Sequence, residues 1–154
     1  LGAGGKMGPT LSMLARNAIA LSGVPRRVIA VSRFADESVS NALKEHGVEV
    51  IALDMLVDGA LEALPDVPNI IYMAGRKFGT GLNQGATWAM NAMLPTLVSR
   101  RFRRSSFVVF STGNVYPFVP IERGGSVEDD VAEPVGEYGM SALAREQIAQ
   151  QPAG

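Results

Sequence analysis

The stretch that decides the fold is Gly2-Ala3-Gly4-Gly5-Lys6-Met7-Gly8, near the amino end of a 154-residue sequence. It stands where a buried strand should pass into a helix. Glycines at positions 2, 5 and 8 allow a sharp turn, a close approach to a ligand and tight packing of a helix on a sheet. The helix start that follows presents unpaired N–H groups and a partial positive charge, which suit a pyrophosphate. The pattern predicts a nucleotide-binding turn, and a glycine-rich turn without a ligand is the alternative.

Four short apolar runs have the character of buried strands. They cover residues 27–32, 48–53, 69–73 and 106–110, and β-branched and aromatic residues dominate them. Segments with helical spacing lie between them, at residues 9–18, before Gly47, and around 84–101 and 137–150. This alternation predicts an α/β fold, a Rossmann-type doubly wound parallel sheet with helices on both faces. A ligand crevice is then expected at the carboxyl ends of the strands.

The length suits one domain, residues 1–154. A single apolar residue precedes the glycines, where a whole strand is expected. We therefore expect the nucleotide-binding domain of a longer chain, without the start of its first strand and without a carboxyl-terminal substrate-binding part. Residues 119–135, rich in proline, glycine and acidic residues, are expected to form a long surface loop beside the site.

Composition argues against several classes of partner. The net charge is −1 with mixed signs, so no nucleic acid is expected. The cluster Arg100, Arg101, Arg103 and Arg104 suits the last turn of a helix better than an RNA contact. The absence of cysteine and the single histidine, His46, predict no disulfide and no metal site. No run is apolar and long enough to span a bilayer, so we expect no membrane partner and a cytoplasmic location.

The first two of these strands end in residues that could meet the adenosine half of a dinucleotide. Ser32 and Arg33 follow the glycines at about the distance of a ribose contact. An acidic residue there would bind the ribose hydroxyls, whereas the guanidinium of Arg33 suits a 2′-phosphate and favours NADP over NAD. An ordinary surface cation is the alternative for Arg33. Asp54 and Met55 are placed to meet the adenine edge, and Asp54 equally suits a turn.

The other two strands end in small and polar residues. Met73, Ala74 and Gly75 would let backbone approach the cofactor. The last strand leads into Ser111-Thr112-Gly113-Asn114-Val115-Tyr116, and Tyr138 follows at the start of a helix. The sequence therefore gathers hydroxyl and phenol groups after its last strand.

In the order and spacing of these motifs the whole sequence resembles the extended short-chain dehydrogenase/reductases, the family of NAD-dependent epimerases and dehydratases. The glycine turn is similar to that family's G-x-x-G-x-x-G. Residues 73–77 resemble its fourth-strand Ala-Gly segment, in which a following lysine contacts the cofactor. Asn91 matches a helical asparagine, residues 111–116 the motif of the catalytic Ser/Thr, and residues 138–147 the tyrosine helix.

The resemblance implies an oxidoreductase, epimerase or dehydratase that acts on a hydroxyl or carbonyl of a sugar-like substrate, with nucleotide sugars among the candidates. It implies NADP or NAD as cofactor and a homodimer built on the helices around 84–101 and 136–150. Thr112 would bind the reacting oxygen, Tyr138 would exchange its proton, and Asn114 would add a polar contact. The implied cofactor-binding residues are Gly2, Gly5, Lys6, Met7, Gly8, Ser32, Arg33, Asp54, Met55, Met73, Ala74, Gly75, Lys77 and Asn91.

One position departs from the family pattern. Y-x-x-x-K would place a lysine four residues after Tyr138, on the same helical face, but residue 142 is alanine. Such a lysine favours a phenolate, because a free tyrosine is only about one-thousandth ionised at pH 7. Arg145 and Lys77 are candidate replacement cations. Ala142 also favours an alternative function, a cofactor-binding sensor or scaffold that has lost hydride transfer.

Overall fold

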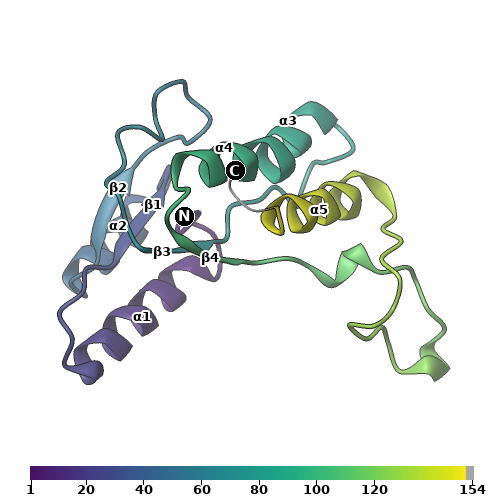
Figure 1. The fold of residues 1–154 in the computed structure, drawn as a ribbon, viewed down its shortest axis with the longest axis horizontal. Coiled ribbons are helices and arrows are strands. Elements are labelled where there is room, and N and C mark those ends of the chain that lie inside the picture. The colour runs from purple at the N-terminus through teal and green to yellow at the C-terminus, as the bar shows by residue number, and fades with distance from the viewer. Residues whose placement is uncertain (152–154) are drawn as a thin grey trace. The chain divides into compact units, whose positions relative to one another are not determined.

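The computed structural model describes residues 1–151 as short strands and longer helices (Figure 1). The described residues form two compact units. Unit 1 contains residues 1–65 and 72–74, and unit 2 contains residues 66–71 and the chain from Gly75 onward.

The elements follow one another as the alternating pattern predicted. They are α1 (Gly8–Ser22), β1 (Ile29–Ser32), α2 (Glu37–Glu45), β2 (Glu49–Ala52), β3 (Asn69–Tyr72), α3 (Gln84–Trp88), a π-helical turn (Ala89–Met93), α4 (Leu94–Arg101), β4 (Ser106–Val109), two 3-10 turns (Gly113–Val115 and Ile121–Arg123) and α5 (Gly136–Ala149). Every strand has four residues, so each is one or two residues shorter than its apolar run.

In unit 1 the chain start lies between two strand segments. β1 and β2 are parallel, with Ile29 opposite Glu49. The amides of residues 2 and 3 both donate to the carbonyl of Val31, at 2.8 and 3.1 Å, and Met73 N–H donates to the carbonyl of Leu1 at 2.9 Å. Leu1, Gly2 and Ala3 therefore lie between the backbone of β1 and the residues that follow β3, in the position of a Rossmann first strand.

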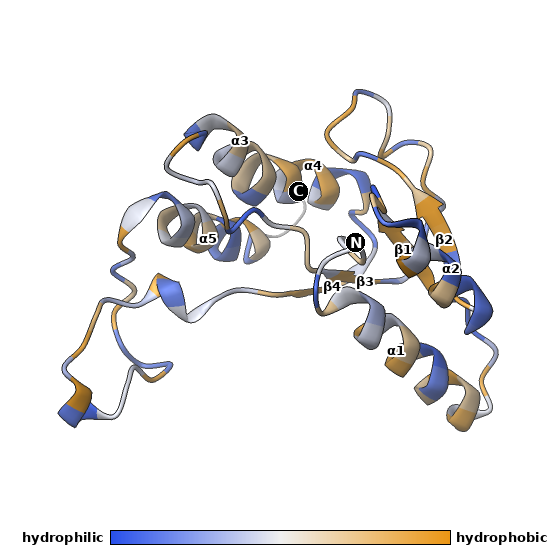
Figure 2. Ribbon diagram, turned by 180° about the vertical axis from the view of Figure 1, so that it is seen from behind, coloured by the Kyte–Doolittle hydropathy of each residue, from blue (hydrophilic) through white to orange (hydrophobic). Residues whose placement is uncertain are grey.

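The core of unit 1 anchors the ends of these strands. Ala3, Ala30, Phe34, Leu43 and Val48 form one buried cluster, and Figure 2 shows β1 and β2 as a hydrophobic band. Apolar residues on successive strand positions are expected where both faces are covered. The burial of Ala3 in this cluster fixes the glycine turn to the sheet.

Asp36 begins α2 as its N-cap. Its side chain accepts from the amide and the hydroxyl of Ser38, at 2.9 and 2.6 Å. These hydrogen bonds lower the pKa of the Asp36 carboxyl. A charged cap at the helix start stabilises the segment that follows β1.

Unit 2 is built around α5. This helix contacts α3, the π-helical turn, α4, β4 and the turn Gly113–Val115, and Figure 1 shows α5 alongside α3 and α4. Its buried residues are Gly139, Ser141, Ala142 and Arg145. β3 and β4 pair in this part of the chain, so the strands form two two-stranded sheets where a single sheet was predicted.

The predicted helix over 84–101 is interrupted. Leu94 N–H donates to the carbonyl of Ala89, five residues back, which defines the π-helical turn. Pro95 lies in the first turn of α4, where its missing N–H is tolerated. A wide turn just before a proline relieves the clash that its ring would make in a continuous α-helix.

Residues 117–135 form the surface loop that the sequence predicted. Within it Phe118, Ile121 and Val131 expose apolar side chains. Val127 N–H and Arg123 both bind Asp130, and the Val127 amide contributes most to lowering the pKa of that carboxyl. Among residues 1–151 no helix combines the length and apolar character needed to cross a membrane.

Candidate functional site

Gly2 and Gly8 of the amino-terminal turn occupy positions that no side chain could share, and Gly4 packs closely against a side chain. Gly2 has a φ of 84°, and a Cβ there would lie 2.5 Å from the Ala74 amide nitrogen. A Cβ on Gly8 would lie 2.3 Å from the carbonyl oxygen of Ala3. A Cβ on Gly4 would lie 2.7 Å from Ser32 Oγ. The turn is therefore packed by backbone against the ends of β1 and β3 and against the start of α1.

The outer side of this turn is open. Gly4, Gly5, Lys6 and Met7 are exposed, and the nearest atom to a Cβ on Gly5 is 3.6 Å away. No side chain caps α1, and its first turn holds no acidic residue. The positive end of its helix dipole is therefore available to an anion.

Gly4 is a residue that sequence reasoning missed. The spacing argument selected Gly2, Gly5 and Gly8, yet it is Gly4 that packs against Ser32. The signal was the adjacent pair Gly4-Gly5, because two glycines in a row allow one to pack and the other to face a ligand.

The end of β1 carries an exposed cation on a fixed backbone. Arg33 is exposed, while Phe34 is buried in the core with a φ of 46°, a left-handed conformation that is rare for a bulky residue. Burial of the phenyl ring holds the backbone in this strained conformation. The backbone beside Arg33 is therefore fixed, while the Arg33 side chain is exposed to solvent.

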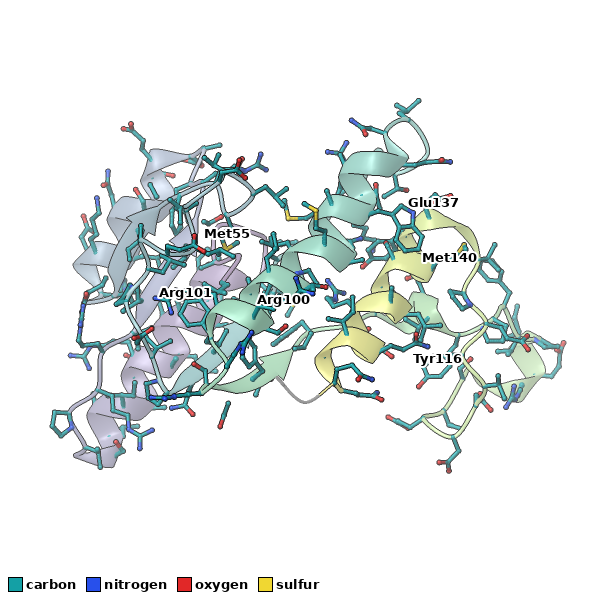
Figure 3. The ribbon with its side chains drawn as sticks, turned by 45° about the horizontal axis from the view of Figure 1, so that its top comes forward. Met55, Arg100, Arg101, Tyr116, Glu137 and Met140 are labelled. Carbon is teal, nitrogen blue, oxygen red and sulfur yellow. The ribbon has the colours of Figure 1, made fainter. Side chains whose placement is uncertain are left out.

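Asp54 and Met55 have structural roles in unit 1. Asp54 Oδ1 accepts from Leu56 N–H at 3.0 Å, so the turn interpretation of Asp54 is correct. Met55, labelled in Figure 3, is buried. Contact of either residue with an adenine stays a prediction.

In unit 2 the turn that carries Thr112 and Asn114 packs against the first turns of α5. Thr112 Oγ1 donates to Asn114 Oδ1 at 3.1 Å and accepts from Asn114 N–H at 3.3 Å. A Cβ on Gly139 would lie 2.5 Å from the Asn114 carbonyl oxygen. Because Gly139 follows Tyr138, the structure brings the element of Thr112 and Asn114 next to the helical turn of Tyr138.

Two polar contacts hold α5 at both ends. Trp88 Nε1 donates to the carboxylate of Glu137, labelled at the start of α5 in Figure 3. Ser111 Oγ donates to Glu146, about two and a half turns further along the helix. Sequence reasoning missed both pairs, because their members are far apart in the chain. They fix the orientation of the helix that presents Tyr138.

Asn91 links three segments of unit 2. Its Oδ1 accepts from Arg76 N–H at 2.7 Å, and its Nδ2 donates to the Arg76 carbonyl at 3.0 Å and to Ser141 Oγ at 2.9 Å. The side chain is fully buried and both amide hydrogens are used. Its geometry therefore suits a positioning role for the turn after β3, instead of the direct cofactor contact that the resemblance implies.

The two candidate replacement cations differ in environment. Lys77 is exposed, with its Nζ 5.8 Å from the centroid of the Phe78 ring. Arg145 is buried on the α5 face that also holds Ala142, and its Nη1 would lie 2.9 Å from a Cβ on Gly75. A side chain at position 75 would therefore require this guanidinium to shift.

Solved structures of known proteins share this fold. UDP-glucuronic acid 4-epimerase from Bacillus cereus, in complex with UDP-glucuronic acid and NAD, aligns with a TM-score of 0.75 and 19% identity, over 96% of this chain and 49% of that chain. ADP-L-glycero-D-manno-heptose-6-epimerase from Helicobacter pylori aligns with a TM-score of 0.71 and 20% identity, over 96% of this chain and 47% of that chain. A short-chain dehydrogenase/reductase superfamily protein from Agrobacterium tumefaciens with bound NAD aligns with a TM-score of 0.70 and 19% identity, over 99% of this chain and 44% of that chain.

These similarities identify the class of fold. The chain shares the Rossmann fold of these two epimerases and of this short-chain dehydrogenase/reductase superfamily protein, and it spans about half the length of the structures it matches. The predicted fold class is confirmed. No protein-family model and no curated protein matches the sequence.

The glycine turn fits the pyrophosphate of a dinucleotide. The glycine turn is closed to side chains on its inner side and open on its outer side, as close approach of a pyrophosphate requires. Within residues 1–151 no group of three or more His, Asp or Glu side chains could hold a metal ion.

Proposed function

We propose that this protein is an NAD(P)-dependent oxidoreductase, epimerase or dehydratase that acts on a hydroxyl or carbonyl of a sugar-like substrate, with nucleotide sugars as the leading class. The glycine turn is the main observation in favour of this function, because Gly2 and Gly8 leave no room for a side chain while residues 4–7 are exposed. The likeness to structures that hold NAD with UDP-glucuronic acid supports the substrate class.

The cofactor would be held by residues of three kinds. The backbone at Gly2, Gly5, Lys6, Met7 and Gly8 would bind the phosphates, and Ser32, Arg33, Asp54 and Met55 would meet the adenosine. The segment after β3, with Met73, Ala74, Gly75 and Lys77, would line the rest of the cofactor site. Asn91 would hold this segment in place through the backbone of Arg76. When bound, the dinucleotide supplies a hydride acceptor or donor.

The protein's own groups would handle the proton. The Tyr138 phenol can give or take a proton at the reacting oxygen, and it lies at the start of a helix held by the Trp88–Glu137 contact. The Thr112 hydroxyl would leave Asn114 Oδ1 and donate to the same substrate oxygen, after which Asn114 offers a free amide oxygen. This exchange keeps the hydroxyl hydrogen-bonded before and after substrate binds.

The assay that tests this proposal uses the purified protein with a panel of UDP- and ADP-sugars. We expect NADPH or NADH to bind, and at least one sugar to be oxidised, reduced or epimerised. Absence of dinucleotide binding would contradict the proposal. Binding without turnover on any sugar would favour a cofactor-holding sensor or scaffold, the alternative that Ala142 supports. Homodimer formation and a cytoplasmic location stay part of the proposal.

Arg33→Ala should weaken NADPH binding much more than NADH binding. A guanidinium that binds a 2′-phosphate contributes about 1.5–3 kcal/mol through charge-assisted hydrogen bonds, so we expect a loss of about 10- to 100-fold for NADPH alone. Fluorescence titration with both dinucleotides measures it. Equal losses would exclude recognition of the 2′-phosphate. Arg26→Ala, which removes an exposed cation before the other end of β1, is the matched control.

Ala142→Lys should increase turnover. The substitution restores a cation one helical turn from Tyr138, where it stabilises negative charge on the phenol oxygen. We expect an increase of about tenfold in kcat, from a Coulomb term of about 1–2 kcal/mol, if the lysine chain extends from this buried position to the partly exposed Tyr138. Ala142→Met, similar in length and uncharged, controls for the crowding of this buried position. An unchanged rate would mean that another group already supplies the charge.

A further inference from the structure

Arg76 has a side chain that the proposed function does not use. It lies directly after Gly75, in the turn that follows β3, and its guanidinium is partly buried. Within residues 1–151 its Nε–H is buried and has no hydrogen-bond acceptor. A buried donor without an acceptor costs about 1–3 kcal/mol, so the guanidinium gains by meeting one.

The backbone of Arg76 is fixed in an unusual way. Asn91 binds both its N–H and its carbonyl, at 2.7 and 3.0 Å, from the π-helical turn. Asn91 is in turn bound to Ser141 on the helix of Tyr138. The buried Asn91 side chain therefore holds the backbone of Arg76, the residue whose Nε–H has no acceptor, in one position.

The space beside the guanidinium is kept clear by a glycine. Gly79 has a φ of 68°, and a Cβ on it would lie 3.2 Å from Arg76 Nη2. Nη2 and Nε share the edge of a guanidinium that binds two oxygens of one anion side by side. Gly79 therefore lies next to Nη2, which shares an edge of the guanidinium with the Nε that has no acceptor.

The surroundings favour an anion. Lys77 adds a second, exposed cation to the same turn. The turn follows the carboxyl end of a strand, where ligands bind in open α/β sheets. A planar fork with two parallel N–H groups matches a phosphate better than a point charge does.

We propose that Arg76 is a phosphate-binding residue, which receives two oxygens of a bound nucleotide on its Nε and Nη2. The proposal rests on the proposed function, because it assumes that a nucleotide binds. The phosphate comes from the dinucleotide cofactor or from the nucleotide of a sugar substrate, and the chemistry is the same for both.

The test compares Arg76→Gln, Arg76→Lys and the control Arg103→Gln, which removes an exposed cation elsewhere in unit 2. Dissociation constants for NADPH and NADH are measured by fluorescence, and for UDP by calorimetry, with an unfolding curve for each variant. We expect Arg76→Gln to raise the dissociation constant of at least one ligand by about 10- to 100-fold. Arg76→Lys should recover part of the loss, and Arg103→Gln should bind as the wild type does.

The ligand whose affinity falls in Arg76→Gln identifies the source of the phosphate. A loss for both dinucleotides assigns Arg76 to the cofactor, and a loss for UDP alone assigns it to the substrate. Wild-type affinity for all three ligands in Arg76→Gln would overturn the inference. If Arg76→Gln fails to fold, Arg76→Lys decides: it keeps the charge and loses the fork, so unchanged affinity overturns bidentate binding. A wild-type protein that binds no dinucleotide would instead contradict the proposed function.

Discussion

Tyr138→Phe should lower turnover by about 10²- to 10⁴-fold while dinucleotide binding stays within a factor of about two, since that is the usual contribution of a positioned acid–base group. Phenylalanine keeps the ring that is packed at the start of α5 and removes only the O–H. Steady-state kinetics on the active sugar, together with NADPH titration, measure the two effects separately.

Tyr116→Phe is the matched control for this substitution. Tyr116 ends the turn that carries Thr112 and Asn114 and is labelled near α5 in Figure 3, yet it has no proposed role in proton transfer. It should retain wild-type turnover. Normal kinetics in Tyr138→Phe, or an equal loss in Tyr116→Phe, would refute the assignment of Tyr138.

Gly8→Ala should destabilise the protein by about 1–3 kcal/mol and abolish detectable dinucleotide binding. Its Cβ would meet the Ala3 carbonyl at 2.3 Å, so the first turn of α1 must move away from the chain start. That movement displaces the amides of residues 4–7 that we expect to face the phosphates. Urea unfolding measures the first effect and NADPH titration the second.

Gly85→Ala separates this packing effect from helix propensity. Gly85 also lies near a helix start, in α3, and the nearest atom to its Cβ would be 4.0 Å away. Alanine should be neutral or stabilising there, by up to about 1 kcal/mol. Tight dinucleotide binding by a stable Gly8→Ala protein would show that the turn has no part in the site.

Local patterns in the sequence were sufficient to predict the order of the elements. Periodicity separated strands from helices, and the glycine spacing predicted the close packing at Gly2 and Gly8 because steric needs act over a few residues. The strand lengths were overestimated, since apolar residues beyond the hydrogen-bonded ladder are also buried. Leu53, for example, follows β2 as a partly buried residue outside the strand.

The contacts that shape the site could not be predicted in this way. Asn91 reaches Arg76 across fifteen residues and Ser141 across fifty, and Trp88 reaches Glu137 across forty-nine. Such pairs depend on how helices pack, which a single sequence does not encode locally. The π-helical turn before Pro95 likewise replaces an α-helical pattern that the apolar spacing alone predicted.

The most direct measurement is a crystal structure of the protein with bound NADPH. We expect the pyrophosphate to lie against the exposed backbone of residues 4–7, at the amino end of α1, with the 2′-phosphate on Arg33. Phosphates bound away from this turn, or crystals that take up no dinucleotide at saturating concentration, would contradict it.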